Sequence, residues 1–345
     1  MEKMRLGRSG LSVSRQAFGA LPLQRCSLED AVTVLHAAVD GGIDFFDTAR
    51  MYSDSEHKLG IAFKGIRHKL FIATKTKGTN KAEIEEHVAK SLAELRTDYL
   101  DLYQFHNAVD VPRPGDGTER YEAFAALKKS GAIRCIGLTS HSLKVALEAA
   151  GSGLFDTIQF PMSLLATVEE LQLVEKCREA DVGLIAMKAL AGGLIVNIPA
   201  AYAFLRSLET VLPIWGVQSR EELADFLRLE AEPPAYDERM KAAVRAEQEA
   251  LGGRFCRGCG YCLPCPQEIF IPFIARLDRL LRRSPWQQYA EADWVEKMRA
   301  AKSCIQCGAC AERCPYKLDT PELIADNVRD YENFMREHGW NIVLD

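Results

Sequence analysis

Short apolar runs alternate with longer amphipathic segments from the start of the chain to about residue 230. Runs such as LFIAT and LIAM are almost continuously apolar, which is typical of parallel strands covered on both faces by helices. Strands are predicted at residues 43–47, 70–75, 100–106, 133–140, 157–160, 183–189 and 211–217, after an initial strand that ends near Gly19. Helical periodicity is present over residues 27–40, 56–63, 81–95, 118–130, 143–150, 168–180, 200–208 and 220–229.

Eight strand–helix units in succession predict an α/β fold, the (β/α)8 TIM barrel. The opening MRLGRSGLSVS has a glycine between two short runs and predicts an N-terminal hairpin before the barrel. The connector AEPPAYDER then indicates a domain boundary. We therefore expect a barrel over residues 1–230 and a small, mostly helical domain over residues 231–345.

The composition excludes several classes of protein. Hydrophobic residues make up 48% and charged residues 26% of the 345, as in ordinary globular proteins. The net charge of −5 and the absence of a Lys/Arg run give nucleic-acid binding no electrostatic support. No apolar stretch approaches the roughly 18 residues of a membrane span, and the first residues lack the apolar core of a signal peptide. We therefore expect a cytoplasmic protein without membrane contact.

Eight of the eleven cysteines lie in two runs near the C-terminus, and each run ends in Cys-Pro. The runs are Cys256, Cys259, Cys262 and Cys265, then Cys304, Cys307, Cys310 and Cys314. Near-even spacing of this kind suits iron–sulfur clusters, whereas zinc sites usually separate two cysteine pairs by a longer loop. Thiols stay reduced in the cytosol, so metal binding by these cysteines is favoured over disulfides. A zinc site is the alternative to iron–sulfur clusters. The other three (Cys26, Cys135 and Cys177) are interpreted as apolar fillers or exposed thiols.

Eight thiolates suffice for two [4Fe–4S] clusters. In two-cluster ferredoxins the fourth cysteine of each run binds the cluster of the other run. That rule predicts one cluster on Cys256, Cys259, Cys262 and Cys314, and a second on Cys304, Cys307, Cys310 and Cys265. The first run closes with two spacer residues instead of three, a departure that bears on the pairing more than on the number of clusters.

Four polar residues follow the predicted barrel strands, at the end where barrel enzymes carry their active sites. Asp47 and Tyr52 lie in FDTARMYSDSE, Lys75 in IATKT and His106 in LYQFH. A free phenol has a pKa of about 10, and a nearby ammonium favours phenolate, so we expect Lys75 to lower the pKa of Tyr52. In this arrangement Asp47 orients Lys75, while His106 polarises a substrate carbonyl. By contrast, His57, His87 and His141 have no evident partners and are interpreted as surface residues.

The motifs FDTAxxY, TK and LYxxH, in this order, resemble those of the aldo-keto reductase superfamily over about residues 4–226. The resemblance implies that Tyr52 is the general acid/base, that Lys75 and Asp47 tune it, and that His106 orients the carbonyl. It also implies an extended NADP(H), or less often NAD(H), bound across the barrel mouth. The cysteine-rich part resembles the two-cluster ferredoxin domain appended to some bacterial and archaeal members.

The resemblance also implies cofactor-binding positions. Gly19 and Ala20 match nicotinamide and ribose contacts, Gln159 the carboxamide ligand, and Thr139 a small hydroxyl, whereas Ser140 replaces an asparagine. Met187 stands where many members stack a tyrosine on nicotinamide; packing alone is the alternative role. The positions implied for the phosphates and adenine are Lys188, Leu190, Gly192, Gly216, Gln218, Arg220 and Asp225. The lysine and arginine that usually bind the 2′-phosphate of NADP(H) in this family are missing at their positions. Both NADP(H) and NAD(H) are therefore retained as candidate cofactors, and the more frequent use of NADP(H) in the family favours NADP(H).

Two functional hypotheses follow. The first is an enzyme that reduces a small aldehyde or ketone, or oxidises the alcohol, with NAD(P)H. The second is an iron–sulfur electron-transfer or redox-sensing protein that uses the barrel as a docking or nicotinamide-binding body. In either case the clusters have two possible roles, stabilising the C-terminal domain or exchanging electrons with a partner protein. The intact set Asp47, Tyr52, Lys75 and His106 favours the enzyme.

Overall fold

A computed structural model describes residues 1–251, 256–283 and 286–344. The chain divides into two compact units. The first comprises Met1–Ala189 and Pro199–Val244, and the second comprises Leu190–Ile198 and Arg245–Asp345. The connection after the seventh barrel strand therefore belongs to the C-terminal unit, although the strands and helices on either side of it build the barrel.

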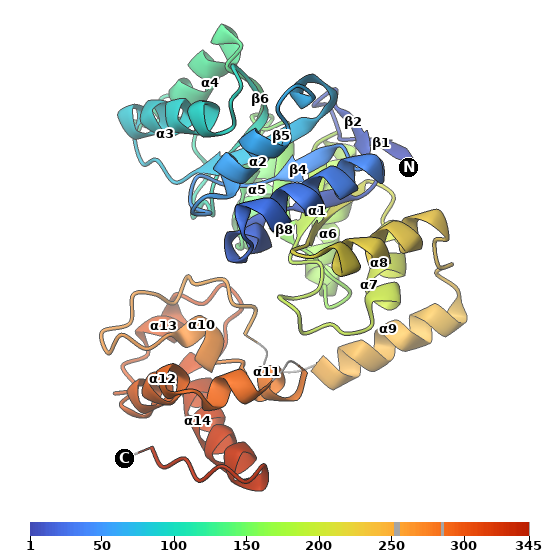
Figure 1. The fold of residues 1–345 in the computed structure, drawn as a ribbon. Helices are drawn as coiled ribbons and strands as arrows, with labels where there is room; N and C mark the ends of the chain where they lie inside the picture. The colour runs from blue at the N-terminus through green and yellow to red at the C-terminus, as the bar shows by residue number, and fades with distance from the viewer. Residues whose placement is uncertain (252–255, 284–285, 345) are drawn as a thin grey trace. The chain divides into compact units, whose positions relative to one another are not determined.

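Within the described residues of the first unit, eight parallel strands close into a barrel in the order β10-β3-β4-β5-β6-β7-β8-β9 (Figure 1). The strands are β3 (Ala17–Gly19), β4 (Phe45–Asp47), β5 (Phe71–Thr76), β6 (Leu100–Phe105), β7 (Ile133–Thr139), β8 (Thr157–Pro161), β9 (Gly183–Met187) and β10 (Val211–Gly216). The predicted (β/α)8 barrel is confirmed. Its strands are almost wholly buried, which accounts for their continuously apolar sequences.

Helices alternate with the strands around the barrel (Figure 1). They are α1 (Leu28–Asp40), α2 (Ser55–Ala62), α3 (Lys81–Glu94), α4 (Arg120–Ser130), α5 (Leu143–Gly151), α6 (Val168–Glu179), α7 (Ile198–Ser207) and α8 (Arg220–Ala231). Several begin with a side chain that accepts a backbone N–H of the first turn, as Ser27 does for α1, Asn80 for α3 and Thr167 for α6. Such a cap is worth about 1 kcal/mol, and these residues fix where the helices start.

The N-terminal hairpin that the sequence predicted is present, and it closes one end of the barrel. Its strands β1 (Lys3–Arg5) and β2 (Ser12–Ser14) pair antiparallel. Met4, Leu6, Leu11 and Val13 are buried in one cluster with interior residues of the barrel strands. Gly7 forms a bridge to Val182, just before β9. Because the hairpin covers the amino ends of the strands, the carboxyl ends remain for a site.

Gly7 has a structural reason to lack a side chain. Its φ is +53°, and an ideal Cβ there would lie 2.2 Å from the backbone nitrogen of Gly183. The hairpin can approach β9 this closely only through a glycine.

The second unit is mostly helical, as expected. Its helices are α10 (Ile271–Ile274), α11 (Leu277–Arg283), α12 (Ala292–Lys302), α13 (Ala309–Glu312) and α14 (Thr320–Glu337), while α9 (Glu238–Leu251) contains the boundary between the units. Helix α14 packs against α10, α11, α12 and α13 through buried residues such as Ile324, Tyr331 and Met335. The buried Asn327 accepts a hydrogen bond from the backbone of Asp278 at 2.6 Å, which ties α14 to α11. None of the helices in the described part of the chain combines the length and apolar character needed to cross a bilayer.

Candidate functional site

The four residues proposed for catalysis meet at the carboxyl end of the barrel. Asp47 is the last residue of β4, Lys75 lies in β5, and Tyr52 precedes α2. Lys75 Nζ donates to Asp47 Oδ2 at 2.6 Å and to the carbonyl oxygen of Thr48 at 2.6 Å. Lys75 Nζ also lies 5.3 Å from the centre of the Tyr52 ring. His106 follows β6, and its ring stands edge-on to Tyr52 with 5.8 Å between ring centres.

The Asp47–Lys75 pair is buried. Asp47 is 2% and Lys75 1% exposed. Burial raises the pKa of Asp47, and the attraction of Lys75 opposes this rise, with further opposition from hydrogen bonds of two glutamines. A buried ion pair of this kind leaves a costly lone charge when either partner is removed. The pair therefore holds Lys75 in a fixed position beside Tyr52.

The pKa of Tyr52 is raised, not lowered as the sequence suggested. Burial is the largest cause; Lys75 lowers the pKa and Asp47 raises it, both to a smaller extent. The sequence shows that an ammonium is near the phenol, but it does not show that the phenol is withdrawn from water. Withdrawal from water favours the neutral phenol and raises its pKa. Tyr52 is therefore held as a protonated phenol, the form that donates a proton.

His106 is neutral at physiological pH. Burial lowers its pKa to about 3, and Lys75 and Lys77 lower it further. Its Nδ1 atom has no hydrogen-bond partner among the residues that the structure describes. A neutral imidazole carries one N–H donor and one acceptor, so this ring can donate a hydrogen bond to a substrate oxygen without carrying charge.

Gln104 is a residue of the site that the sequence reasoning missed. Its Nε2 donates to Gln159 Oε1 at 2.9 Å and approaches Asp47 Oδ1 at 3.4 Å, while Gln159 Nε2 lies 3.5 Å from Asp47 Oδ2. Both glutamines are buried. The signal was present, because Gln104 stands two positions before His106 and alternate residues of a strand share a face.

The next strand end contributes structural hydroxyls and a buried histidine. Thr139 Oγ1 accepts the backbone N–H of Asn107 at 2.7 Å, and Ser140 Oγ donates to the carbonyl oxygen of Ala108 at 2.8 Å. These two candidate cofactor residues therefore hold the loop that carries His106. His141 is 7% exposed, so its interpretation as a surface residue is wrong. Burial lowers its pKa, with Lys188 and His106 contributing.

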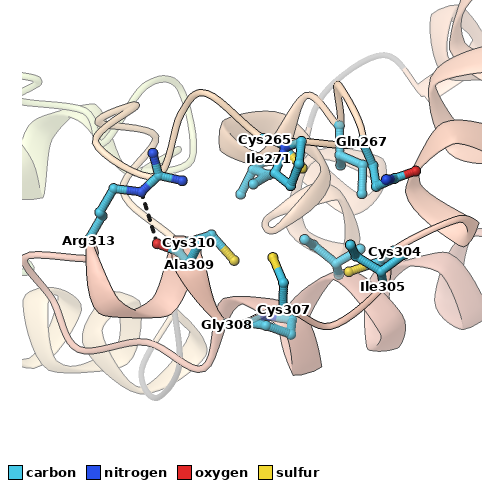
Figure 2. A pocket seen from close by; sticks show the side chains of 14 residues that line it. Cys265, Gln267, Ile271, Cys304, Ile305, Cys307, Gly308, Ala309, Cys310 and Arg313 are labelled. Carbon is cyan, nitrogen blue, oxygen red and sulfur yellow. Dashed lines mark hydrogen bonds between the residues drawn. The ribbon is translucent and has the colours of Figure 1, made fainter.

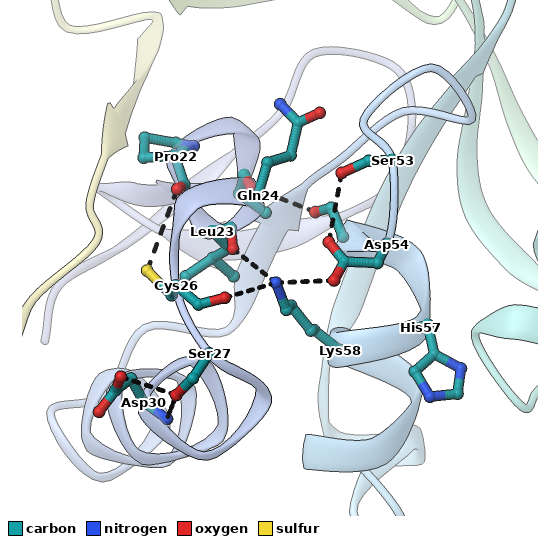
Figure 3. A network of polar contacts seen from close by, with 12 residues as sticks. Pro22, Leu23, Gln24, Cys26, Ser27, Asp30, Ser53, Asp54, His57 and Lys58 are labelled. Atoms are coloured by element: carbon teal, nitrogen blue, oxygen red, sulfur yellow. Dashed lines mark hydrogen bonds and ion pairs between the residues drawn. The ribbon is translucent and has the colours of Figure 1, made fainter.

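A buried lysine connects two segments close to Tyr52 in the chain. Lys58 Nζ donates to the carbonyl oxygens of Leu23 and Cys26, each at 2.8 Å, and pairs with Asp54 at 2.9 Å (Figure 3). Leu23 belongs to the short helix η1 (Leu21–Arg25) that follows β3. Lys58, a residue of α2, thus joins the segment after β3 to Asp54, which lies only two residues beyond Tyr52.

The remaining cofactor candidates occupy strand ends and the loops beyond them. Gly19 ends β3 and Gly216 ends β10, and the backbone N–H of Ala20 bonds to the carbonyl oxygen of Asp47 at 2.9 Å. The partly buried Met187 packs against the barrel interior. The backbone N–H of Gln218 donates to Glu222 at 2.9 Å, and the carbonyl oxygen of Gln218 accepts from the Cys26 thiol at 3.3 Å. Asp225 accepts from Arg228 at 2.8 Å, and Arg220 is exposed.

The stretch after β9 divides between the two units. Met187 and Lys188 belong to the first unit, whereas Leu190 and Gly192 belong to the second. Lys188, Ala191, Gly192 and Gly193 all have positive φ, so the backbone turns sharply here. Gly192 lies against the guanidinium of Arg276, also in the second unit, so that an ideal Cβ would be 2.9 Å from Nη1.

The cysteines of the second unit border two cavities. One is lined by Cys256, Cys259, Cys262 and Cys314. The other is lined by Cys265, Cys304, Cys307 and Cys310, and Figure 2 shows the sulfur atoms of Cys307 and Cys310 directed into it. Each of these two cavities is thus lined by the first three cysteines of one run and the last cysteine of the other run. None of these eight cysteines, all of them within the described residues, forms a disulfide.

The spacing of these sulfur atoms bears on what the cavities hold. Among residues 1–251, 256–283 and 286–344, no three His, Cys, Asp or Glu side chains are close enough to hold a single metal ion. The four thiols of each set line one cavity. Arg313, which lines the second cavity, donates from Nε to the carbonyl oxygen of Ala309 at 2.9 Å (Figure 2).

Comparison with known proteins agrees with both halves. A family model for the aldo/keto reductase family matches residues 15–200, more than half of the chain. The chain belongs to the aldo/keto reductase family. A model of the 4Fe-4S dicluster domain matches residues 255–319, so this aldo/keto reductase carries a ferredoxin-type domain after its barrel.

Individual relatives of this aldo/keto reductase cover the barrel. The uncharacterized oxidoreductase YqkF of Bacillus subtilis is 32% identical over 215 residues, which are 58% of this chain and 68% of that protein. YrpG, another uncharacterized oxidoreductase of B. subtilis, is 31% identical over 226 residues, covering 56% and 68%. The solved holo form of the aldo-keto reductase AKR11C1 from Bacillus halodurans superposes with a TM-score of 0.64 at 25% identity, over 72% of this chain and 96% of that one.

Proposed function

We propose that this oxidoreductase reduces a small aldehyde or ketone to the alcohol with NAD(P)H, and catalyses the reverse oxidation. One observation carries the proposal: a protonated phenol and a neutral imidazole lie beside a buried lysine–carboxylate pair at the carboxyl end of the barrel. A carbonyl oxygen beside Tyr52 and His106 would have a proton donor and a hydrogen-bond donor within reach.

The proposed step moves a hydride and a proton to the carbonyl group. When bound, the reduced nicotinamide supplies a hydride to the carbonyl carbon. Tyr52 gives its phenolic proton to the oxygen, and the nearby Lys75 ammonium stabilises the phenolate that remains. His106 orients the carbonyl through an N–H, and Asp47 keeps Lys75 charged and in position. Reduction uses the phenol and oxidation uses the phenolate, so the raised pKa of Tyr52 favours reduction near neutral pH.

Residues at the barrel mouth fit a nicotinamide amide. Gln104 Oε1 is buried and lacks a hydrogen-bond partner within the described residues, and it lies beside the Gln159 amide. We therefore propose that Gln159, with Gln104 behind it, binds the carboxamide. The other proposed cofactor residues are Gly19, Ala20, Thr139, Ser140, Met187, Lys188, Leu190, Gly192, Gly216, Gln218, Arg220 and Asp225.

The direct test is an anaerobic assay with both NADPH and NADH against a panel of small aldehydes and ketones, starting from protein with its clusters intact. We expect substrate-dependent oxidation of the nicotinamide, with a lower KM for NADPH. Failure to oxidise either cofactor with any carbonyl, in protein that binds the cofactor, would contradict the proposal.

Reduction should show no titration of His106 between about pH 5 and pH 8. The pKa of His106 is lowered to about 3, far below the ordinary value near 6.5, so the ring stays neutral through this range. The pH profile of kcat, compared between the wild type and His106→Gln, tests this. We expect a lower kcat but no change in profile shape, and His57→Gln, an exposed residue paired with Glu94, is the matched control. An acid limb near pH 6.5 that disappears only in His106→Gln would contradict the assignment.

Lys75→Met should destabilise the barrel, and more so at high pH. Removing the ammonium leaves Asp47 buried, a loss of about 3–5 kcal/mol in the free energy of unfolding if the carboxylate stays charged. Without Lys75, burial raises the folded-state pKa of Asp47 further above its unfolded value. The folded state then binds the proton more tightly than the unfolded state does. The free energy of unfolding therefore falls as the pH rises from the unfolded-state pKa of Asp47 to its folded-state pKa. Urea unfolding at pH 5 and pH 8 measures the difference.

The double variant Asp47→Asn/Lys75→Met supplies the control for that experiment. It removes the buried charge along with its partner, so we expect it to recover part of the lost stability and to lose the pH dependence. Equal pH dependence in the single and double variants would show that Asp47 is not the group responsible.

A second candidate function rests on the cysteine-lined cavities. We propose that they hold two [4Fe–4S] clusters, because four sulfurs around a volume suit a cubane better than a single zinc ion bonded at about 2.3 Å. Cys307 is exposed, which would place one cluster within reach of a redox partner protein. Anaerobic titration with NADPH, following cluster absorbance, separates the roles: bleaching favours electron exchange with the barrel, and its absence favours a structural or independent role.

A further inference from the structure

Arg276 is a buried cation that stands over an aromatic ring, with its Cζ 5.1 Å from the centre of the Phe273 ring. It lies between α10 and α11, and only 9% of its surface is exposed. Within the part of the chain that the structure describes, its Nε has no hydrogen-bond partner and no carboxylate lies within ion-pairing distance. A guanidinium stays protonated in proteins, so burial without an anion is costly. The neighbouring Arg282, by comparison, is half exposed and pairs with Asp330 at 2.7 Å.

The guanidinium packs on the loop of the first cysteine run. Gly258 lies between Cys256 and Cys259 and has a φ of +61°. An ideal Cβ at Gly258 would lie 3.0 Å from Cζ of Arg276 and 3.1 Å from its Nη1. The same loop turns its backbone N–H toward sulfur, since Gly258 N donates to Cys256 Sγ at 3.5 Å. The arginine therefore occupies the space that a side chain at position 258 would fill.

The positive charge of Arg276 lies close to the loop of the first cysteine run. The contact with Gly258 places the guanidinium against the backbone between two proposed cluster ligands, Cys256 and Cys259. A cluster held by four thiolates is anionic, and its negative charge grows by one electron on reduction without uptake of a proton. A fixed positive charge in a dry environment stabilises the reduced form more than the oxidised form.

We infer that Arg276 is the internal counter-cation of the cluster at Cys256, Cys259, Cys262 and Cys314, and that it raises the reduction potential of that cluster above that of the other one. Arg257 lines the first cavity, and Arg276 lies behind the loop between Cys256 and Cys259, against Gly258. The second cavity is bordered by Arg313, which is exposed and bonds to backbone carbonyl oxygens. The inference rests on the proposed pairing of the cysteines. It assigns Arg276 a positioning and tuning role, not a catalytic one.

The test compares the cluster potentials of full-length wild type, Arg276→Gln and Arg276→Lys. Each protein is reduced anaerobically with dithionite and mediators, and the two one-electron steps are followed by electron paramagnetic resonance. We expect one step to move to a more negative potential in Arg276→Gln while the other stays, and Arg276→Lys to lie between this variant and the wild type. Arg282→Gln, which removes an arginine from the adjoining helix α11, should leave both steps unchanged.

Iron and sulfide content keeps the cluster proposal separate from the inference. Protein without iron overturns the clusters themselves, whereas protein with full iron and unshifted potentials in Arg276→Gln overturns only the role of Arg276. Equal shifts of both steps, or the same shift in Arg282→Gln, would also overturn it. If Arg276→Gln does not assemble its clusters, Arg276→Met takes its place as a second variant that removes the charge but keeps an unbranched side chain: full iron with both potentials unchanged in this variant would likewise overturn the role of Arg276.

The contact between Arg276 and Gly192 suggests a different role for the arginine, in cofactor binding. Because Arg276 also contacts Gly192, in the loop proposed to bind the nicotinamide phosphates, the arginine could instead serve cofactor binding. The affinity of each variant for NADPH is therefore measured in parallel. Weaker NADPH binding with unchanged potentials in Arg276→Gln would overturn the inference in favour of that role, and unchanged binding with a shifted potential would support it.

Discussion

Tyr52→Phe is expected to lower kcat for carbonyl reduction by about 10²–10⁴-fold, because it removes the only proton that the proposed step delivers from the protein. The aromatic ring, its contact with His106 and its distance from Lys75 need not change. The affinity for nicotinamide should therefore stay close to that of the wild type. Steady-state kinetics with the best substrate of the panel, together with fluorescence titration of NADPH binding, measures both quantities.

Tyr121→Phe is the matched control for this experiment. It removes a phenolic hydroxyl from the same barrel, one that donates to the carbonyl oxygen of Leu154 at 3.1 Å and lies on α4. We expect its kcat to remain near that of the wild type. If Tyr52→Phe keeps most of its activity, the reductase mechanism proposed here fails. If activity is lost but dithionite still reduces the clusters, the two halves carry separable chemistry.

The fold was readable from the sequence because its signals are local. Each barrel strand is a short apolar run and each helix has its own periodicity, so LFIAT indicates β5 without knowledge of its neighbours. The closure of the barrel then follows from the number of units. The helix bounds agree closely for the same reason: Ser27, Asn80 and Thr167 mark helix starts through their own side chains.

The electrostatics of the site were not readable in the same way. The direction of the Tyr52 pKa depends on how much water reaches the phenol, and this is decided by residues distant in sequence. Gln104 and His141 become part of the site only when neighbouring strands are placed in register. Arg276 is a stronger case, because its contacts with Gly192 and Gly258 join positions far apart in the chain. Spacing and periodicity carry no information about such contacts.

The cysteine pairing is an intermediate case, since spacing suggested a cross-run arrangement and the two cavities have the matching lining. Double variants turn this into a sharp prediction. Cys259→Ala/Cys314→Ala removes two ligands from one proposed cluster, so the iron content should fall by about half, from about eight to about four per chain. Cys259→Ala/Cys265→Ala removes one ligand from each cluster, so both should be damaged and iron loss should be much greater.

Pairing within each run predicts the reverse order, because Cys259 and Cys265 would then share a cluster while Cys259 and Cys314 would not. Alanine is chosen because serine oxygen can itself bind iron. Cys26→Ala serves as the control: its thiol contacts the carbonyl oxygen of Gln218 at 3.3 Å in the barrel unit, so iron content should not change. Iron analysis, sulfide analysis and the electron paramagnetic resonance spectrum of the surviving cluster decide between the two pairings. Greater iron loss in Cys259→Ala/Cys314→Ala than in Cys259→Ala/Cys265→Ala would contradict the cross-run arrangement, and would remove the cluster that Arg276 is inferred to serve.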